Sequence, residues 1–302
     1  MIKLFLVLIC VVSLGAREIT PNEVYSQVVI IEQELKTIFK YYGVEDKSIR
    51  KVRVIRTALK PRNVWQLTYE ITVKMNMLRI KNKLPTIEPV NMEPVLNLNP
   101  DLVYEQTQRI LTEIRIFKYR KGIDYAKVKE KKFYNKTPVD VFNALSRVSL
   151  QFDIINKAGF TPSYVFGETM RIYDDLSTIL SHLKIQDNTI PTQRNEKATP
   201  RDTFNTAMKI LDKIKRIQFS VGIETVDFTS FRDDNPTPSD VFTMTQMIIA
   251  ELQTIKAYVG LIHYVTPAAT FRTDKTPVDV DQLMNWNLRK ISLLESREGS
   301  LR

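Results

Sequence analysis

The chain has 302 residues, of which 43% are apolar and 26% are charged, and its formal net charge is +10. This apolar content excludes an intrinsically disordered chain and is sufficient for one or two packed cores. The single cysteine, Cys10, lies in the first apolar segment. The rest of the chain therefore has no cysteine for a disulfide, a thiolate metal site or a nucleophile.

Residues 1–16 have the pattern of a signal peptide. Lys3 precedes the apolar residues 4–14, and the small residues Gly15 and Ala16 follow them. No later segment has the 18 or so apolar residues that a membrane span requires. We expect cleavage near Ala16, a periplasmic or secreted location and no transmembrane span in the mature protein. A short buried helix is the alternative interpretation. Export without cysteine is more typical of a bacterial periplasm than of eukaryotic secretion.

Eight copies of one short motif recur along the chain. Each has a proline, a valine or threonine three residues later and, except in the last copy, an aromatic residue four later. The prolines are Pro21, Pro61, Pro100, Pro138, Pro162, Pro200, Pro238 and Pro277. Threonine precedes six of them, and an acid follows five of them two residues later. These residue types are preferred at the N-cap, the first and the third position of a helix, so the motif predicts eight helix starts.

The residues after each proline repeat one apolar register, at +3, +7, +10, +14 and +17. In the first copy these are Val24, Val28, Ile31, Leu35 and Ile38. Alternating steps of four and three average about 3.5 residues, which is the period of left-handed helix packing. The sequence therefore predicts an all-α fold of eight heptad-patterned helices, each of about 20 residues.

The spacing of the prolines predicts the connections. Successive prolines are 38 to 40 residues apart, but Pro138 and Pro162 are separated by 24. Only Gly159 and Phe160 then lie between two helices, which predicts a tight antiparallel hairpin. The other connections have some 17 extra residues, long for a helical bundle. Either they run back along the bundle, so that consecutive helices are parallel, or they form a functional surface at one end.

The two halves of the chain match each other. Residues 136–141 and 275–280 both have the sequence Lys-Thr-Pro-Val-Asp-Val, and the other motif copies pair at similar offsets. We predict a duplicated pair of four-helix bundle-like units with long extended connections, 17–160 and 161–302. The first unit has 26 basic and 16 acidic residues, a net charge of +10, whereas the second has 17 and 18. Tetratricopeptide-like solenoids have a comparable period, but they have two helices per repeat.

The last copy of the motif differs from the others. Asp281 replaces the aromatic residue, and Asn287 occupies a position of the apolar register. Terminal repeats often have one face in solvent, so we expect both residues to face solvent. The alternative is a buried asparagine that specifies a partner's register.

The chain has no recognisable catalytic or nucleotide-binding motif. Its two histidines, His182 and His263, have no patterned acid nearby. We predict no catalytic residue, no metal site and no cofactor. The repeated aromatic residues are expected in the core, and a stacking platform is the alternative.

The best candidates for a binding surface are basic residues in two connections of the first unit. The first connection contributes Lys47, Arg50, Lys51, Arg53 and Arg56, and the second contributes Lys127, Lys129, Lys131 and Lys132. Such a surplus of positive charge attracts acidic proteins and anionic polymers. A solvated surface without a partner is the alternative.

Together these features predict a non-catalytic, exported helical-repeat scaffold or adaptor of the bacterial cell envelope. Its basic first half would bind an envelope protein or an anionic polymer. Nucleic acid is not expected for an exported protein, and an oligomer is compatible with the pattern. The alternative function is a periplasmic helical-bundle ligand-binding or sensory module with its site between helices.

Overall fold

A computed structural model describes residues 18–44, 52–128 and 131–297. Within these ranges the chain is all-helical, with eight α-helices, one short 3-10 helix (Thr229–Phe231) and no strand, which confirms the predicted fold class. The helices are α1 Pro21–Tyr41, α2 Pro61–Lys81, α3 Pro100–Lys121, α4 Pro138–Asn156, α5 Pro162–His182, α6 Pro200–Ser220, α7 Pro238–Tyr258 and α8 Pro277–Ser296. No helix in the described part has the length and apolar content to cross a membrane.

Every helix begins at its predicted proline. In five of them the preceding threonine and the acid at the third helical position form a capping box, as with Thr137 and Asp140 in α4. There the backbone N–H of Thr137 donates to the Asp140 carboxylate at 2.9 Å. Thr161 is the exception, because its side chain makes no capping hydrogen bond and the third position of α5 holds Tyr164.

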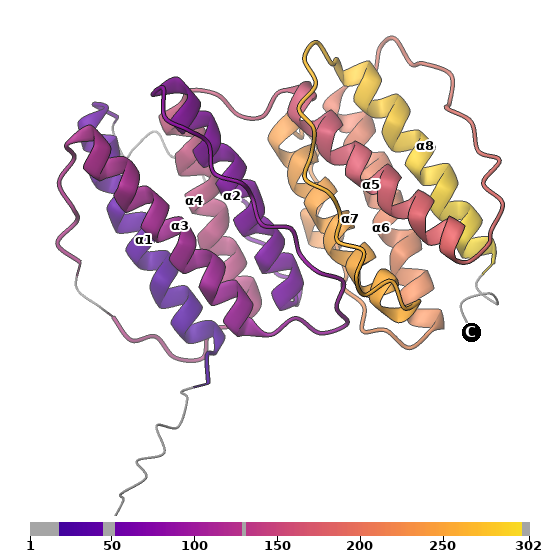
Figure 1. Ribbon diagram of the computed structural model, residues 1–302, viewed down its shortest axis with the longest axis horizontal. Helices are drawn as coiled ribbons and strands as arrows, with labels where there is room; N and C mark the ends of the chain where they lie inside the picture. The colour runs from indigo at the N-terminus through magenta and orange to yellow at the C-terminus, as the bar shows by residue number, and fades with distance from the viewer. Residues whose placement is uncertain (1–17, 45–51, 129–130, 298–302) are drawn as a thin grey trace, which may run out of the picture.

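The helices form two groups of four (Figure 1). The first group closes as a ring in the order α1–α3–α2–α4, and the second as α5–α7–α6–α8. The four prolines that begin α1 to α4 surround one small apolar hollow, and those that begin α5 to α8 surround another. All four helices of a group therefore start at the same end and run parallel. This confirms that the long connections run back along the bundle.

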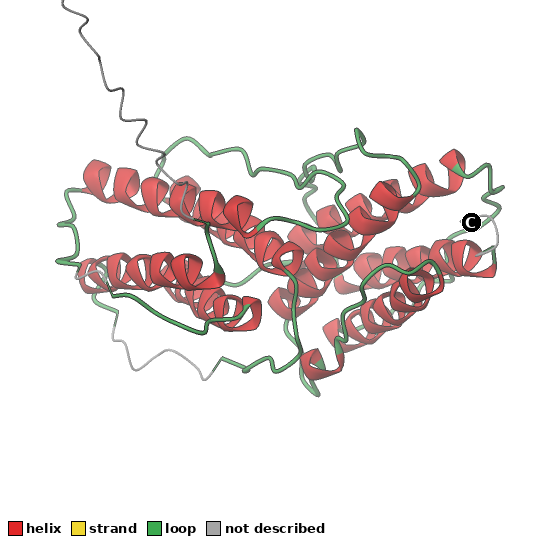
Figure 2. Cartoon of the chain, turned by 90° about the horizontal axis from the view of Figure 1, so that it is seen from below, coloured by secondary structure: helices red, strands yellow, loops and turns green. Residues whose placement is uncertain are grey.

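Figure 2 shows the connections as loops lying along the helices. Asn143 on α4 exchanges two hydrogen bonds of 2.9 Å with the backbone of Ile55 in the first connection. Asn76 on α2 holds the backbone of Ile87 in the same way, at 2.7 and 2.9 Å. These asparagine clamps satisfy backbone groups that no strand partner binds.

The predicted apolar register is the core of both groups. All its positions are buried, including Ile110 on α3 and Ile210 on α6. The repeated aromatic residues pack against it. Trp65, Phe142, Phe204 and Phe242 are buried, whereas Tyr25, Tyr104 and Phe166 are half-buried.

The expectation for α8 was wrong. Asp281 and Asn287 are both buried, and the Asn287 amide donates to the carbonyl oxygen of Thr169 on α5 at 2.9 Å. The physical reason is that the four helices form a closed ring. In it α8 packs between α5 and α6, whereas the last helix of an open stack would have one face in solvent.

The main contact between the groups joins α2 and α7 rather than α4 and α5, so the predicted hairpin is not the packing unit. Arg62 in the first turn of α2 contacts Glu251 in the second half of α7. Glu70 in the middle of α2 contacts Thr243 near the start of α7, so the two helices are antiparallel. The short link after α4 fits tightly against the start of α7. A Cβ atom on Gly159 would lie 2.6 Å from the Ser239 hydroxyl oxygen, and Phe160 stacks on Phe242 with ring centroids 3.8 Å apart.

Several contacts recur at matched positions of the two groups. A buried ion pair joins Lys118 to Glu34 in the first group, and another joins Lys256 to Asp175 in the second. Burial raises the pKa of Asp175, while Lys256 and Thr266 act in the opposite direction. These positions are related by offsets of 141 and 138 residues, as the motif copies are. Duplication and the boundary at residue 160 stay predictions.

Candidate functional site

The predicted basic residues are exposed where the structure describes them. Arg53, Arg56, Lys127, Lys131 and Lys132 all have exposed side chains. The remaining four, which lie outside the described residues, are Lys47, Arg50, Lys51 and Lys129.

The two basic connections lie against different parts of the molecule. Ile55, in the first connection, is clamped by Asn143 on α4, whereas Phe133 in the second packs edge-on against Tyr25 of α1 with centroids 4.9 Å apart. Arg53 is already engaged, because it forms a 2.5 Å ion pair with Asp233 and donates to the backbone of Phe231. The structure therefore does not unite the predicted residues into one site.

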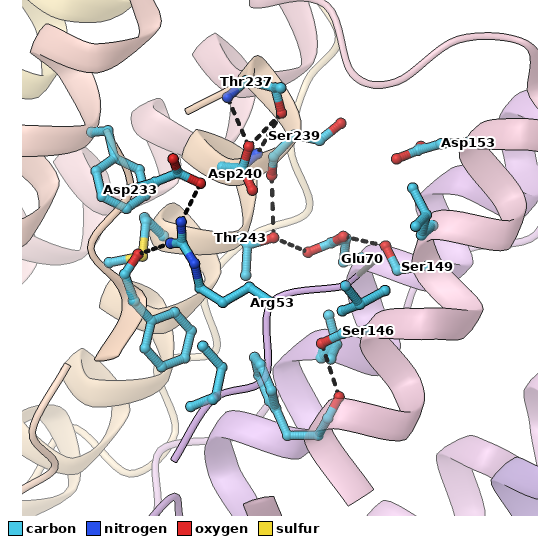
Figure 3. Close-up of a pocket in the computed structure, with 18 of the residues that line it drawn as sticks. Arg53, Glu70, Ser146, Ser149, Asp153, Asp233, Thr237, Ser239, Asp240 and Thr243 are labelled. Carbon is cyan, nitrogen blue, oxygen red and sulfur yellow. Dashed lines mark hydrogen bonds and ion pairs between the residues drawn. The ribbon is translucent and has the colours of Figure 1, made fainter. Parts of the chain in front are cut away.

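A cleft of about 400 Å³ opens between the two helix groups (Figure 3). Its walls come from α2, α4 and the first turns of α7, together with Phe204 of α6 and the connections that precede α2 and α7. Of the predicted binding residues, it includes only Arg53, at the Arg53–Asp233 ion pair. The volume lies in the usual range of small-molecule sites.

One wall of the cleft is polar and centres on Lys74 of α2. The ammonium group donates to the Ser149 hydroxyl at 2.8 Å and to Asp153 at 2.7 Å, and it lies 3.4 Å from Glu70. Glu70 in turn accepts hydrogen bonds from the hydroxyls of Ser149 at 2.6 Å and Thr243 at 2.8 Å. The hydroxyls of Ser149 and Thr243 and the ammonium of Lys74 are thus committed as donors.

Asp153 is the least satisfied member of this wall. The pKa of its carboxyl is raised to about 6, mainly by burial; Lys74 opposes this rise, and the nearby charges of Glu70 and Asp240 add to it. One carboxylate oxygen binds Lys74, but the other, Oδ1, is buried and accepts no hydrogen bond within the described part of the chain. Asp153 is therefore the member of this wall whose hydrogen-bonding capacity is least used.

Apolar side chains also line the cleft. They include Leu67 from α2, Phe142 from α4, Met244 from α7 and Phe231 from the 3-10 helix. Phe142 and Phe231 meet edge to face with ring centroids 5.6 Å apart. Phe142 and Phe231 are only 2% and 6% exposed, so their rings contribute little accessible surface to the cleft.

The sequence pattern did not single out this cleft, and only part of it had a signal. The apolar run around Met247 and Ile248 continues round all sides of α7, which indicates a helix buried on every face. For Lys74, Glu70 and Asp153 no such signal exists, because each is also compatible with a solvated helix face.

No protein-family model matches the chain, and comparisons with curated proteins and with solved structures also find no match. The function must therefore be inferred from the charges and the geometry of the chain itself.

Proposed function

We propose that the protein is an exported, non-catalytic scaffold or adaptor of the bacterial cell envelope. Its basic first half, residues 17–160, would bind an acidic envelope protein or an anionic polymer. The observation that supports this proposal is the surplus of exposed positive charge in the described part of that half. Twelve basic side chains are exposed there, against five acidic ones: Glu18, Glu88, Glu93, Glu105 and Asp124. In the described part of residues 161–302 the corresponding numbers are ten and eight.

The basic connection that precedes α4 is the best single contact surface. Its bases Lys127, Lys131 and Lys132 are exposed, as are the rings of Tyr125 and Tyr134. The end of the connection is fixed to the bundle, because the Lys136 ammonium lies 4.5 Å from the centre of the Tyr25 ring. A partner would meet positive charge and aromatic rings on a segment that is anchored to α1.

The test compares two triple variants of the full mature chain. K127E/K131E/K132E reverses the basic connection, and K184E/K197E/K209E makes the same charge change at exposed positions of the second half. Heparin serves as the anionic probe, in a salt series from about 50 to about 500 mM. We expect the first variant to lose about tenfold or more in affinity and the second to lose little. Equal losses, or binding that salt does not weaken, would overturn the proposal.

Export is tested separately. The intact mass of the protein purified from its native host should correspond to a chain that begins after Ala16. A mature chain that retains Met1 would contradict a cleaved signal peptide and with it the envelope location.

A further inference from the structure

The carboxyl ends of α1 to α4 form one end face of the first helix group. All four helices start at the same ring of prolines and run parallel, so their last turns lie together at the opposite end of the group. Contacts join these ends. The Tyr42 hydroxyl after α1 donates to the Asn82 side chain after α2 at 3.0 Å, and Lys81 donates to the backbone of Asn156 at the end of α4. Neighbouring helices are about 8–10 Å apart, so the end face is roughly 20 Å across.

This end face has exposed basic residues and no exposed acidic residue. Five bases are exposed there: Lys40, Lys81, Lys83, Arg120 and Lys157. Among the described residues, the last two turns of the four helices and the two residues after each of them include no exposed aspartate or glutamate. The end face therefore has a local surplus of positive charge.

Two of these lysines occupy positions where the backbone favours glycine. Lys83 and Lys157 have φ angles of 55° and 51°, whereas Gly43 and Gly122, at the same positions after α1 and α3, both have 65°. The left-handed conformation costs an L-residue free energy that glycine avoids. A cation beside the last carbonyl oxygens of a helix offsets only part of that cost. Backbone geometry therefore does not explain the two charges, which indicates a role for them at the surface.

Apolar side chains lie among the bases. Tyr41, Ile80 and Tyr119, all in last turns, are 51%, 57% and 78% exposed. Tyrosine is favoured at the boundary between lipid and water, where its ring is in an apolar layer and its hydroxyl keeps its hydrogen bonds. An anionic polymer would neutralise the bases but would leave these three side chains in water. An anionic bilayer offers them both kinds of contact, and its flat surface can meet all four helix ends at once.

We propose that this end face docks on an anionic lipid surface, with its five bases at the headgroups and its three exposed apolar side chains in the interfacial layer. Each base near such a surface adds an attraction that falls off within a Debye length, and buried apolar area adds to the binding. The end face is distinct from the basic connection before α4. In that connection the Ala126 N–H donates to Glu34, about two turns before the end of α1. The inference therefore goes beyond the scaffold function.

The experiment measures binding of the full mature chain to lipid vesicles by flotation. Vesicles of equal parts phosphatidylglycerol and phosphatidylcholine are the anionic probe, and vesicles of phosphatidylcholine alone are the neutral one. We expect binding to the anionic vesicles to be about tenfold or more tighter, and to weaken as salt rises from about 50 to about 500 mM. No binding to the anionic vesicles, or equal binding to both, overturns the proposal.

Charge variants locate the contact. K83G/K157G removes two bases by the exchange that the backbone favours, so the chain should stay folded while vesicle affinity falls about tenfold. K184G/R297Q is the matched control, because it removes two exposed bases after α5 and α8, and Lys184 also has a positive φ, of 55°. It should change vesicle affinity little. Thermal unfolding followed by circular dichroism shows that both variants are folded, and equal losses of affinity overturn the proposal.

Apolar variants distinguish a lipid surface from other anionic partners. I80S/Y119S keeps every charge, and it should weaken vesicle binding about threefold or more while leaving heparin binding unchanged. F219S/Y258S, at the corresponding exposed positions of α6 and α7, should change neither. Vesicle binding that I80S/Y119S leaves intact would show a contact by charge alone and would overturn the lipid assignment. The heparin test of the basic connection is read separately, so either proposal can fail without the other.

Discussion

Arg62 on α2 and Glu251 on α7 form a buried, bidentate ion pair between the helix groups. The Arg62 Nε atom donates at 3.0 Å to one carboxylate oxygen, and a terminal nitrogen donates at 2.9 Å to the other. Asn63 and Gln218 donate to the same carboxylate, at 2.8 and 2.7 Å. The pair aligns the first turn of α2 with the second half of α7.

Removing the Arg62 side chain should destabilise the whole chain. R62A leaves the Glu251 carboxylate buried without its cation, a change that typically costs about 3–5 kcal/mol in the free energy of unfolding. Urea unfolding followed by circular dichroism measures it. R216A is the control, because Arg216 pairs with Glu295 at the surface with 55% of its side chain exposed, and it should cost less than about 1 kcal/mol. Equal costs would show that the groups do not depend on the buried pair.

The predicted apolar register can be tested with two adjacent residues of α6. Ile210 is fully buried, whereas Lys209 is exposed. I210D should unfold the chain or cost several kcal/mol, because a lone carboxylate would be buried in the core. K209D should change the free energy of unfolding by about 0.5 kcal/mol or less. If the two variants have the same stability, the register is incorrect.

The helix starts and this register could be predicted because their signals are local. A proline, a preceding threonine and a following acid act within one helical turn, and the core positions repeat within one helix. The Arg62–Glu251 pair could not be predicted in this way, since its partners are 189 residues apart. The cleft could not be predicted for the same reason, because Glu70, Asp153 and Asp240 come from three helices.

The error at Asn287 has a related cause. The sequence shows that this position interrupts the apolar register, but it does not show whether the eight helices form an open stack or closed rings. In a ring, α8 has neighbours on both sides, and the amide finds the backbone oxygen of Thr169. A polar residue in the register therefore indicated a buried hydrogen bond and not a solvent-facing end.

The caps of α4 and α5 give a matched pair of threonine variants. Thr137 shares a capping box with Asp140, whereas the Thr161 side chain makes no capping hydrogen bond. T137A should lower the free energy of unfolding by about 1 kcal/mol. T161A should lower it by about half of that or less, because no cap is lost. Thermal and urea unfolding measure both, and a larger cost for T161A would contradict the role of the capping box.

Asp153 should make stability depend on pH in a direction opposite to that of most carboxylates. Its pKa is raised to about 6 in the folded chain, above the ordinary value of about 3.9 for an unfolded aspartate. The folded state therefore holds the proton more tightly than the unfolded state does. The resulting stabilisation is complete below about pH 4 and is lost as the pH rises through about 6.

D153N isolates this effect, because it removes the titrating group and leaves the other ionisable groups in place. The free energy of unfolding of the parent chain relative to D153N should fall by about 2–3 kcal/mol between pH 4 and pH 7, the equivalent of roughly two pKa units. Urea unfolding at half-unit pH steps measures the difference, and an NMR titration of the Asp153 carboxyl gives its pKa directly. A difference that rises with pH would mean that Lys74 outweighs burial and stabilises the ionised form. The Lys74–Asp153 ion pair would then stabilise the charged carboxylate in the folded chain.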